Sequence, residues 1–214
     1  PLMESLEERK SVLFKVCNIF EEELHDNRQA ILTYHRILEL DTQDGEVLRA
    51  LVRLNTAESR WEALLEIRGR QLELTAEPAA RHDLKQAMAL VLWRELARTP
   101  EAIEIFAGIL NEDPDYLPAR EALEELLTLP ETELAAARLL EPLYARDNRH
   151  ADLIHTLEIE ARHEETITTR RDLFLRMADL AERRVSDPAR AFGFTLSALS
   201  DDPQNAQIRE AGER

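Results

Sequence analysis

The sequence predicts an all-α protein, an α-solenoid of stacked antiparallel helical hairpins. The chain of 214 residues contains only 5 glycines, and aromatic residues make up 5% of it, whereas β-sheets draw on β-branched and aromatic residues with glycine in their turns. Leu, Ala, Glu and Arg, all good helix formers, are the commonest residues. Apolar residues recur every three or four positions, as in Val12, Val16, Ile19 and Phe20, which is the spacing of one helix face.

An internal repeat organises the chain. Residues 9–54 match residues 81–126, mainly at apolar and helix-capping positions, and residues 81–122 match residues 170–211 in turn. Chance matches rarely recur at the same positions at two spacings, so the repeated unit is real. Each short hairpin has an apolar face that it cannot bury alone, and stacking on neighbouring hairpins buries it.

The repeated units differ in length. The second spacing exceeds the first by about one helix and its turn, and segment 131–147 has no counterpart in the first unit. We therefore expect this segment to be one helix that is inserted in the second unit or deleted from the first. The chain is expected to form a single helical-repeat domain over residues 1–214, with units at about 9–80, 81–169 and 170–214.

Start signals define the helices in order. Asp-Pro pairs such as Asp113-Pro114 and Asp187-Pro188 place an N-cap acceptor before a proline suited to the first helical turn. The connections between apolar runs are only a few residues long. The expected helices, about twelve in all, span residues 4–25, 28–40, 44–57, 60–76, 79–98, 100–112, 115–128, 131–146, 149–165, 168–186, 188–200 and 204–212.

The segment 83–116 resembles the tetratricopeptide repeat. The characteristic positions of that family hold Trp93, Ala102, Phe106, Ile109 and Pro114. The same positions hold Glu21, Ala30, Tyr34, Ile37 and Thr42 in the first unit, and Glu182, Ala191, Thr195, Ala198 and Pro203 in the third. The resemblance implies that the repeated alanine lies where the two helices of a hairpin approach closely.

The unit spacings are not multiples of the family's repeat length, so the sequence is tetratricopeptide-like (TPR-like) rather than a regular array. Its long units, with segments such as those at 140–148 and 187–192, resemble the units of very large bacterial repeat proteins. This resemblance implies that the chain is a fragment of such a protein.

Charge and composition exclude several classes of function. The chain carries 27 positive and 43 negative residues, a net charge of −16, which opposes binding to nucleic acid. The single cysteine, Cys17, cannot form an internal disulfide, and its apolar helix face predicts a buried structural residue. No apolar run is long enough to span a bilayer. We therefore expect no direct membrane insertion and a soluble protein of the cytoplasm or periplasm.

The sequence contains no catalytic, cofactor-binding or metal-binding pattern. It lacks glycine-rich phosphate loops and nucleophile motifs. His150, His155 and His163 lie near several glutamates, but their spacings differ from the i, i+4 pairing of zinc-binding helices. We therefore expect solvent-exposed histidines, no cofactor and no metal.

The family resemblance implies where a partner would bind. Tetratricopeptide solenoids present the first helix of each hairpin to a concave groove that receives a peptide. At such positions, Lys15, Arg94, Arg176 and Arg183 form a candidate basic strip within an acidic protein. The alternative is that these side chains pair with nearby glutamates in helical salt bridges. A carboxylate clamp is not expected, because apolar residues replace its asparagine: Ile19, Val91 and Leu180.

The expected function is a non-catalytic protein–protein interaction scaffold. Its partners would be proteins or peptides, including neighbouring repeats of the same longer chain. Two alternatives stay open at this point, namely a helical-repeat enzyme with a site assembled across repeats and an RNA-processing helical-repeat factor. The short turns and the missing catalytic pattern disfavour the enzyme, and the net charge of −16 disfavours RNA binding.

Overall fold

The computed structural model describes residues 5–203, and every regular element in that range is helical. This confirms the predicted all-α class, and each described helix lies within a few residues of its expected position. The predicted helix at 204–212 lies outside the described residues. In chain order the helices are α1 (Leu6–Asn18), α2 (Asn27–Leu40), α3 (Gly45–Ala57), α4 (Trp61–Leu74), α5 (Pro78–Arg94), α6 (Thr99–Glu112), α7 (Leu117–Leu126), α8 (Glu133–Arg146), α9 (His150–His163), α10 (Ile167–Leu180) and α11 (Pro188–Asp201), with π-helical segments η1 (Ile19–Glu23) after α1 and η2 (Ala181–Val185) after α10.

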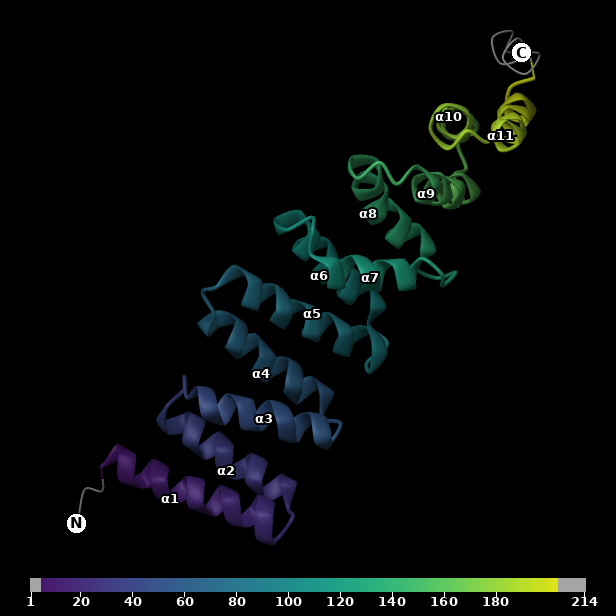
Figure 1. The fold of residues 1–214 in the computed structure, drawn as a ribbon. Coiled ribbons are helices and arrows are strands. Elements are labelled where there is room, and N and C mark those ends of the chain that lie inside the picture. Colours follow the sequence, from purple (N-terminus) through teal and green to yellow (C-terminus); the bar gives the residue numbers. More distant parts are fainter. Residues whose placement is uncertain (1–4, 204–214) are drawn as a thin grey trace. The chain divides into compact units, whose positions relative to one another are not determined.

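The chain divides into two compact units, residues 1–105 and 106–214. In the first unit, α1 to α5 lie side by side in sequence order, each antiparallel to the one before it (Figure 1). In the second unit, α7 to α11 likewise pack each on the next. Within each unit, the described helices that pack extensively are consecutive in the chain, which is the pattern of a helical-repeat stack. No helix between residues 5 and 203 combines the length and apolar character needed to cross a membrane.

Each unit buries its own apolar side chains between consecutive helices. In the first unit the core is formed by α1 to α4 and includes Cys17, Ala30, Ile31, Ile37, Val47, Leu51 and Ile67. In the second unit the buried residues include Leu123, Leu126, Leu140, Ile154, Leu157 and Met177. Burying one large aliphatic side chain stabilises a fold by about 1.5–3 kcal/mol. Because the buried residues come from several helices, each of these helices contributes to the stability of its unit.

The sequence prediction for Cys17 is confirmed. Its side chain is fully buried in the core of the first unit. Burial raises the pKa of the thiol to about 12, so the reactive thiolate is scarcely populated at neutral pH. Cys17 therefore serves as a small apolar packing residue.

The repeated alanines are buried as the tetratricopeptide resemblance implies. Ala30 of α2 and Ala102 of α6 are fully buried, and Ala191 of α11 is 7% exposed. An aromatic side chain follows about one helical turn later in α2 and α6, where Tyr34 and Phe106 are buried. The small side chain leaves room for a neighbouring helix, and the aromatic ring fills the space beside it.

Three helix ends have the same backbone geometry at equivalent positions of the repeat. His25, Ala97 and Ser186 have φ values of 51°, 55° and 59°, which is the left-handed conformation that ends many helices. The next residue in each case donates its backbone N–H to the carbonyl six residues earlier, over 2.8 Å from Asp26, 2.7 Å from Arg98 and 2.9 Å from Asp187. The repeat read from the sequence is therefore present in the backbone as well.

A second type of turn relates α3–α4 to α8–α9. Ser59 and Asn148 are left-handed, with φ values of 52° and 57°, and the residue after each donates to the carbonyl five residues earlier, over 2.8 Å and 2.9 Å. The additional helix expected at 131–147 is present as α8, which precedes the second of these turns. Helix α3 therefore matches α7 by the sequence repeat and α8 by the turn that follows it.

Ion pairs that connect neighbouring helices recur at equivalent positions as well. In the first unit, Lys10 of α1 contacts the carboxylates of Asp41 and Asp44, each at 2.8 Å, at the turn between α2 and α3. In the second unit, Arg171 of α10 pairs with Asp202 at 3.1 Å, just after α11. The hydrogen bond from Lys10 lowers the pKa of Asp41, so this pairing stabilises the fold above the ordinary pKa of an aspartate and is lost on acidification.

We predict that Ala97→Gly leaves the stability unchanged or raises it by up to about 1 kcal/mol. The left-handed conformation costs a non-glycine residue roughly 1–2 kcal/mol, and the greater freedom of glycine in the unfolded chain offsets part of the gain. As a control, Ala87→Gly within α5 should lower the free energy of unfolding by about 1 kcal/mol. Urea denaturation measures the free energy of unfolding of both variants. An equal loss of stability in Ala97→Gly and Ala87→Gly would contradict the left-handed helix end at Ala97.

Candidate functional site

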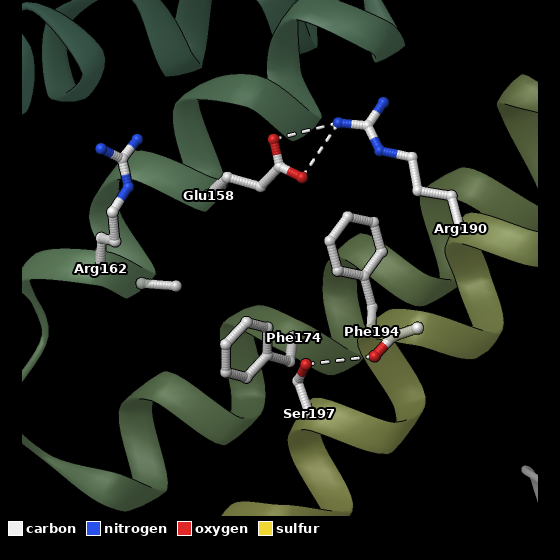
Figure 2. A pocket seen from close by; sticks show the side chains of 8 residues that line it. Glu158, Arg162, Phe174, Arg190, Phe194 and Ser197 are labelled. Carbon is white, nitrogen blue, oxygen red and sulfur yellow. Dashed lines mark hydrogen bonds and ion pairs between the residues drawn. The ribbon is translucent and has the colours of Figure 1, made fainter.

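An open groove of about 500 Å³ lies in the second unit, between α9, α10 and α11. Figure 2 shows its two phenylalanines near one another, with charged side chains above them. Its lining residues are Glu158, Ala161 and Arg162 from α9, Phe174 from α10, and Arg190, Gly193, Phe194 and Ser197 from α11. The groove is therefore built from three consecutive helices.

The floor of the groove is apolar. The ring of Phe194 is buried, with 8% exposed, and Phe174 is half-buried. Gly193 lies between Arg190 and Ser197 on the same face of α11, and a Cβ atom built there would have no neighbour within 4 Å. The hydroxyl of Ser197 donates to the carbonyl of Gly193 at 3.1 Å. A Cβ atom at position 193 would thus meet no neighbouring side chain.

The rim of the groove is charged but balanced. Nη2 of Arg190 lies 3.0 Å from both carboxylate oxygens of Glu158, and its guanidinium lies 5.6 Å from the centre of the Phe194 ring. Arg162 pairs with Glu133 of α8 at 3.3 Å. Asp187 caps α11 by accepting the backbone N–H of Arg190 at 3.0 Å, which fixes the first turn of the helix. The groove can therefore bury an apolar side chain and offer hydrogen bonds at its edge.

The four residues of the predicted basic strip have different surroundings. Lys15 is exposed in the last turn of α1, and the guanidinium of Arg94 lies 5.0 Å from the centre of the Trp93 ring. Arg176 pairs with Glu141 of α8 at 2.5 Å, and Arg183 pairs with Asp179 at 2.9 Å. Lys15 and Arg94 belong to one unit and Arg176 and Arg183 to the other, so the strip itself stays a prediction.

The groove residues were missed by sequence reasoning because they are contributed by three helices. One signal was present, since Gly193 lies inside a helix, where glycine is costly relative to alanine. Of the three histidines expected to be solvent-exposed, His155 and His163 are exposed, whereas His150 is half-buried. His163 lies 2.8 Å from Glu133, and His155 lies 3.9 Å from Glu158. Between residues 5 and 203, no group of three or more His, Cys, Asp or Glu side chains could hold a metal ion.

Glu160 of α9 is a partly buried carboxyl group close to Glu141 and Arg176. One of its oxygens, Oε1, is buried without a hydrogen-bond partner. Burial raises the pKa of Glu160, and the charge of Glu141 raises it further, while Arg138 and Arg176 act in the opposite direction. Arg176 therefore offsets part of the repulsion between two carboxylates, which is a structural task separate from any partner.

Comparisons with known proteins concern the fold. The chain is similar to the crystal structure of YrrB, described as a TPR protein with an unusual peptide-binding site, at 11% identity over 99% of both chains and a TM-score of 0.37. It is similar to a tetratricopeptide repeat protein from Parabacteroides merdae at 15% identity, over 95% of this chain and 83% of that one, with a TM-score of 0.39. A thermophilic TPR protein in Thermus thermophilus matches at 15% identity, over 95% of this chain and 97% of that one, with a TM-score of 0.33.

No family model and no curated protein sequence matches the chain. The chain is TPR-like. This description rests on the chain's own features, namely the recurrent helix ends and the burial of Ala30, Ala102 and Ala191. The solved structures resemble the chain only distantly.

We predict that Glu160→Gln raises the melting temperature near pH 7, because it removes a charge that burial and Glu141 disfavour. The pKa of Glu160 is raised in the folded state, so the folded protein binds this proton more tightly than the unfolded chain does. The wild type therefore regains stability as the pH falls, and the advantage of the variant should disappear by about pH 4. Thermal unfolding at several pH values measures this, with the exposed Glu165→Gln as a control. A pH-independent difference would contradict the assignment.

Proposed function

We propose that the chain is a non-catalytic interaction scaffold that holds a peptide segment of a partner protein in the groove between α9, α10 and α11. The observation that supports this most directly is the apolar floor of Phe174 and Phe194 below a charge-balanced rim. An apolar side chain of the partner would enter the groove beside Gly193, where the absence of a side chain leaves room. The polar rim would then bind the backbone on either side of that side chain.

The energetics favour a short segment rather than a single residue. Burying one apolar side chain contributes about 1.5–3 kcal/mol, whereas micromolar affinity requires about 8 kcal/mol. Several residues must therefore contact the groove and its rim. A rigid groove on packed helices also avoids the ordering cost that a flexible loop would add.

The basic residues Lys15, Arg94, Arg176 and Arg183 stay proposed contacts for acidic parts of a partner. Lys15 is the simplest of them to test, because it is exposed. Arg176 is the least suited, because its removal would also leave Glu141 without this ion-pair partner and Glu160 with less compensating positive charge.

We predict that Gly193→Leu weakens peptide binding at least about tenfold. The Cβ atom of the new side chain would have no neighbour within 4 Å, so the side chain would extend into the groove. A tenfold change in affinity corresponds to about 1.4 kcal/mol. The probe is a synthetic fluorescent peptide selected from a random twelve-residue phage library on the wild-type chain. Fluorescence polarisation measures its affinity.

Gly69→Leu is the matched control. Gly69 also lies inside a helix with no neighbour within 4 Å of its Cβ position, but it lies on α4, outside the groove. The affinity of Gly69→Leu for the peptide should stay within about twofold of the wild type. Circular dichroism should show that both variants fold. Unchanged binding to Gly193→Leu would refute the groove as the peptide site.

A further inference from the structure

The first unit contains a second pocket that is independent of the groove. It has a volume of about 470 Å³ and lies where α3 begins, α4 ends and α5 begins. Its apolar part is formed by Leu48, Leu74 and Leu84, and two arginines, Arg49 and Arg68, also line it. A pocket of this size, largely apolar with a few polar groups, is typical of small-molecule sites.

Arg68 of α4 is a half-buried cation without a counter-ion. Its Nη1 donates to Oε1 of Gln71 at 3.2 Å, and no carboxylate within residues 5–203 pairs with it. Burial lowers the pKa of the guanidinium. A guanidinium has five N–H donors, so the neutral amide of Gln71 satisfies only a small part of its capacity.

Two other half-buried arginines of the chain are paired with carboxylates, whereas the half-buried Arg81 donates to the backbone carbonyls of Leu72 and Thr75. The side chain of Arg120 is 12% exposed and lies 2.5 Å from Asp147, and that of Arg170 is 30% exposed and lies 2.6 Å from Asp201. Such pairs offset the cost of removing a charge from water. Arg68 lacks this compensation, and it faces a pocket.

Arg49 adds a second positive charge to the pocket. Its Nη1 lies 3.5 Å from the position that a Cβ atom of Gly45 would occupy, so the guanidinium lies over the first turn of α3. Asp83 of α5 also lines the pocket and has an interaction of its own. Two cations and one carboxylate leave the pocket with a net positive charge in a chain whose net charge is −16.

We propose that this pocket binds a small organic carboxylate with an apolar body. The carboxylate would accept hydrogen bonds from Arg68 and Arg49, and the apolar body would lie against Leu48, Leu74 and Leu84. Arginine suits this task because its planar donors match the two oxygens of a carboxylate. The ligand would supply the counter-ion that the fold itself does not give to Arg68.

The first experiment compares hexanoate with hexanamide, which has the same shape and no charge. We expect hexanoate to cause saturable shifts of the Gln71 side-chain and Thr75 backbone amide signals in NMR spectra, with a dissociation constant in the range of about 1 mM. Hexanamide should cause shifts at least about tenfold weaker. Equal effects of the two compounds would refute recognition of the carboxylate.

The second experiment tests Arg68 itself. Arg68→Met keeps an unbranched side chain but removes the charge, so we expect it to abolish the hexanoate effect and to raise the melting temperature without ligand. Arg70→Met, on the same helix and outside the pocket, should keep the hexanoate effect. A lower melting temperature for Arg68→Met than for Arg70→Met, or unchanged hexanoate binding, would show that Arg68 serves the fold and would overturn the proposal.

The same chemistry could be supplied by an acidic side chain of a partner protein. A capped peptide with glutamate between two leucines distinguishes the two sources. Hexanoate should bind at least as tightly as this peptide and compete with it. A peptide that binds at least about tenfold more tightly than hexanoate would overturn the assignment to a free small molecule.

Discussion

The central constraint on this chain is that each helix has an apolar face that only the next helix can cover. In the first unit, the buried side chains of α2, such as Ile31 and Ile37, lie in one cluster with Leu51 of α3 and Ile67 of α4. No helix pair encloses this core alone. The turns are short because consecutive helices must lie side by side. This arrangement also brings a helix close to a later turn, where ion pairs such as Lys10–Asp41 can form.

The sequence predicted the fold well because its signals are local. Proline and aspartate mark helix starts, as at Pro188 and Asp187, and the apolar period identifies the buried faces. The repeated alanines could be found because small residues are required where helices approach closely. The groove could not be predicted, because Phe174 and Phe194 meet only through the packing of two helices. The same holds for Arg68, since the absence of a carboxylate beside it is a property of the folded unit.

Charge is used differently in the two candidate sites. In the groove, Arg190 is matched by Glu158 at 3.0 Å, so the rim attracts neither anions nor cations strongly and selectivity would depend on shape. In the pocket of the first unit, Arg68 lacks such a match, and selectivity would depend on the sign of the ligand's charge. Most half-buried arginines in the described part of this acidic chain pair with carboxylates. An arginine without such a partner, such as Arg68, is therefore one of the few interior cations left to bind a ligand.

The additional helix α8 shifts the order of helices in the stack. In the first unit, α3 is followed two helices later by α5, the counterpart of α1, and alternate helices of an antiparallel stack point the same way. In the second unit, α7 is the counterpart of α3, but α10, the counterpart of α1, comes three helices later. Within that unit, the additional helix α8 thus changes the interval between these two counterparts from two helices to three. Equivalent repeat positions therefore do not recur at a constant helix interval, and a ligand with a regular period could not match all of them.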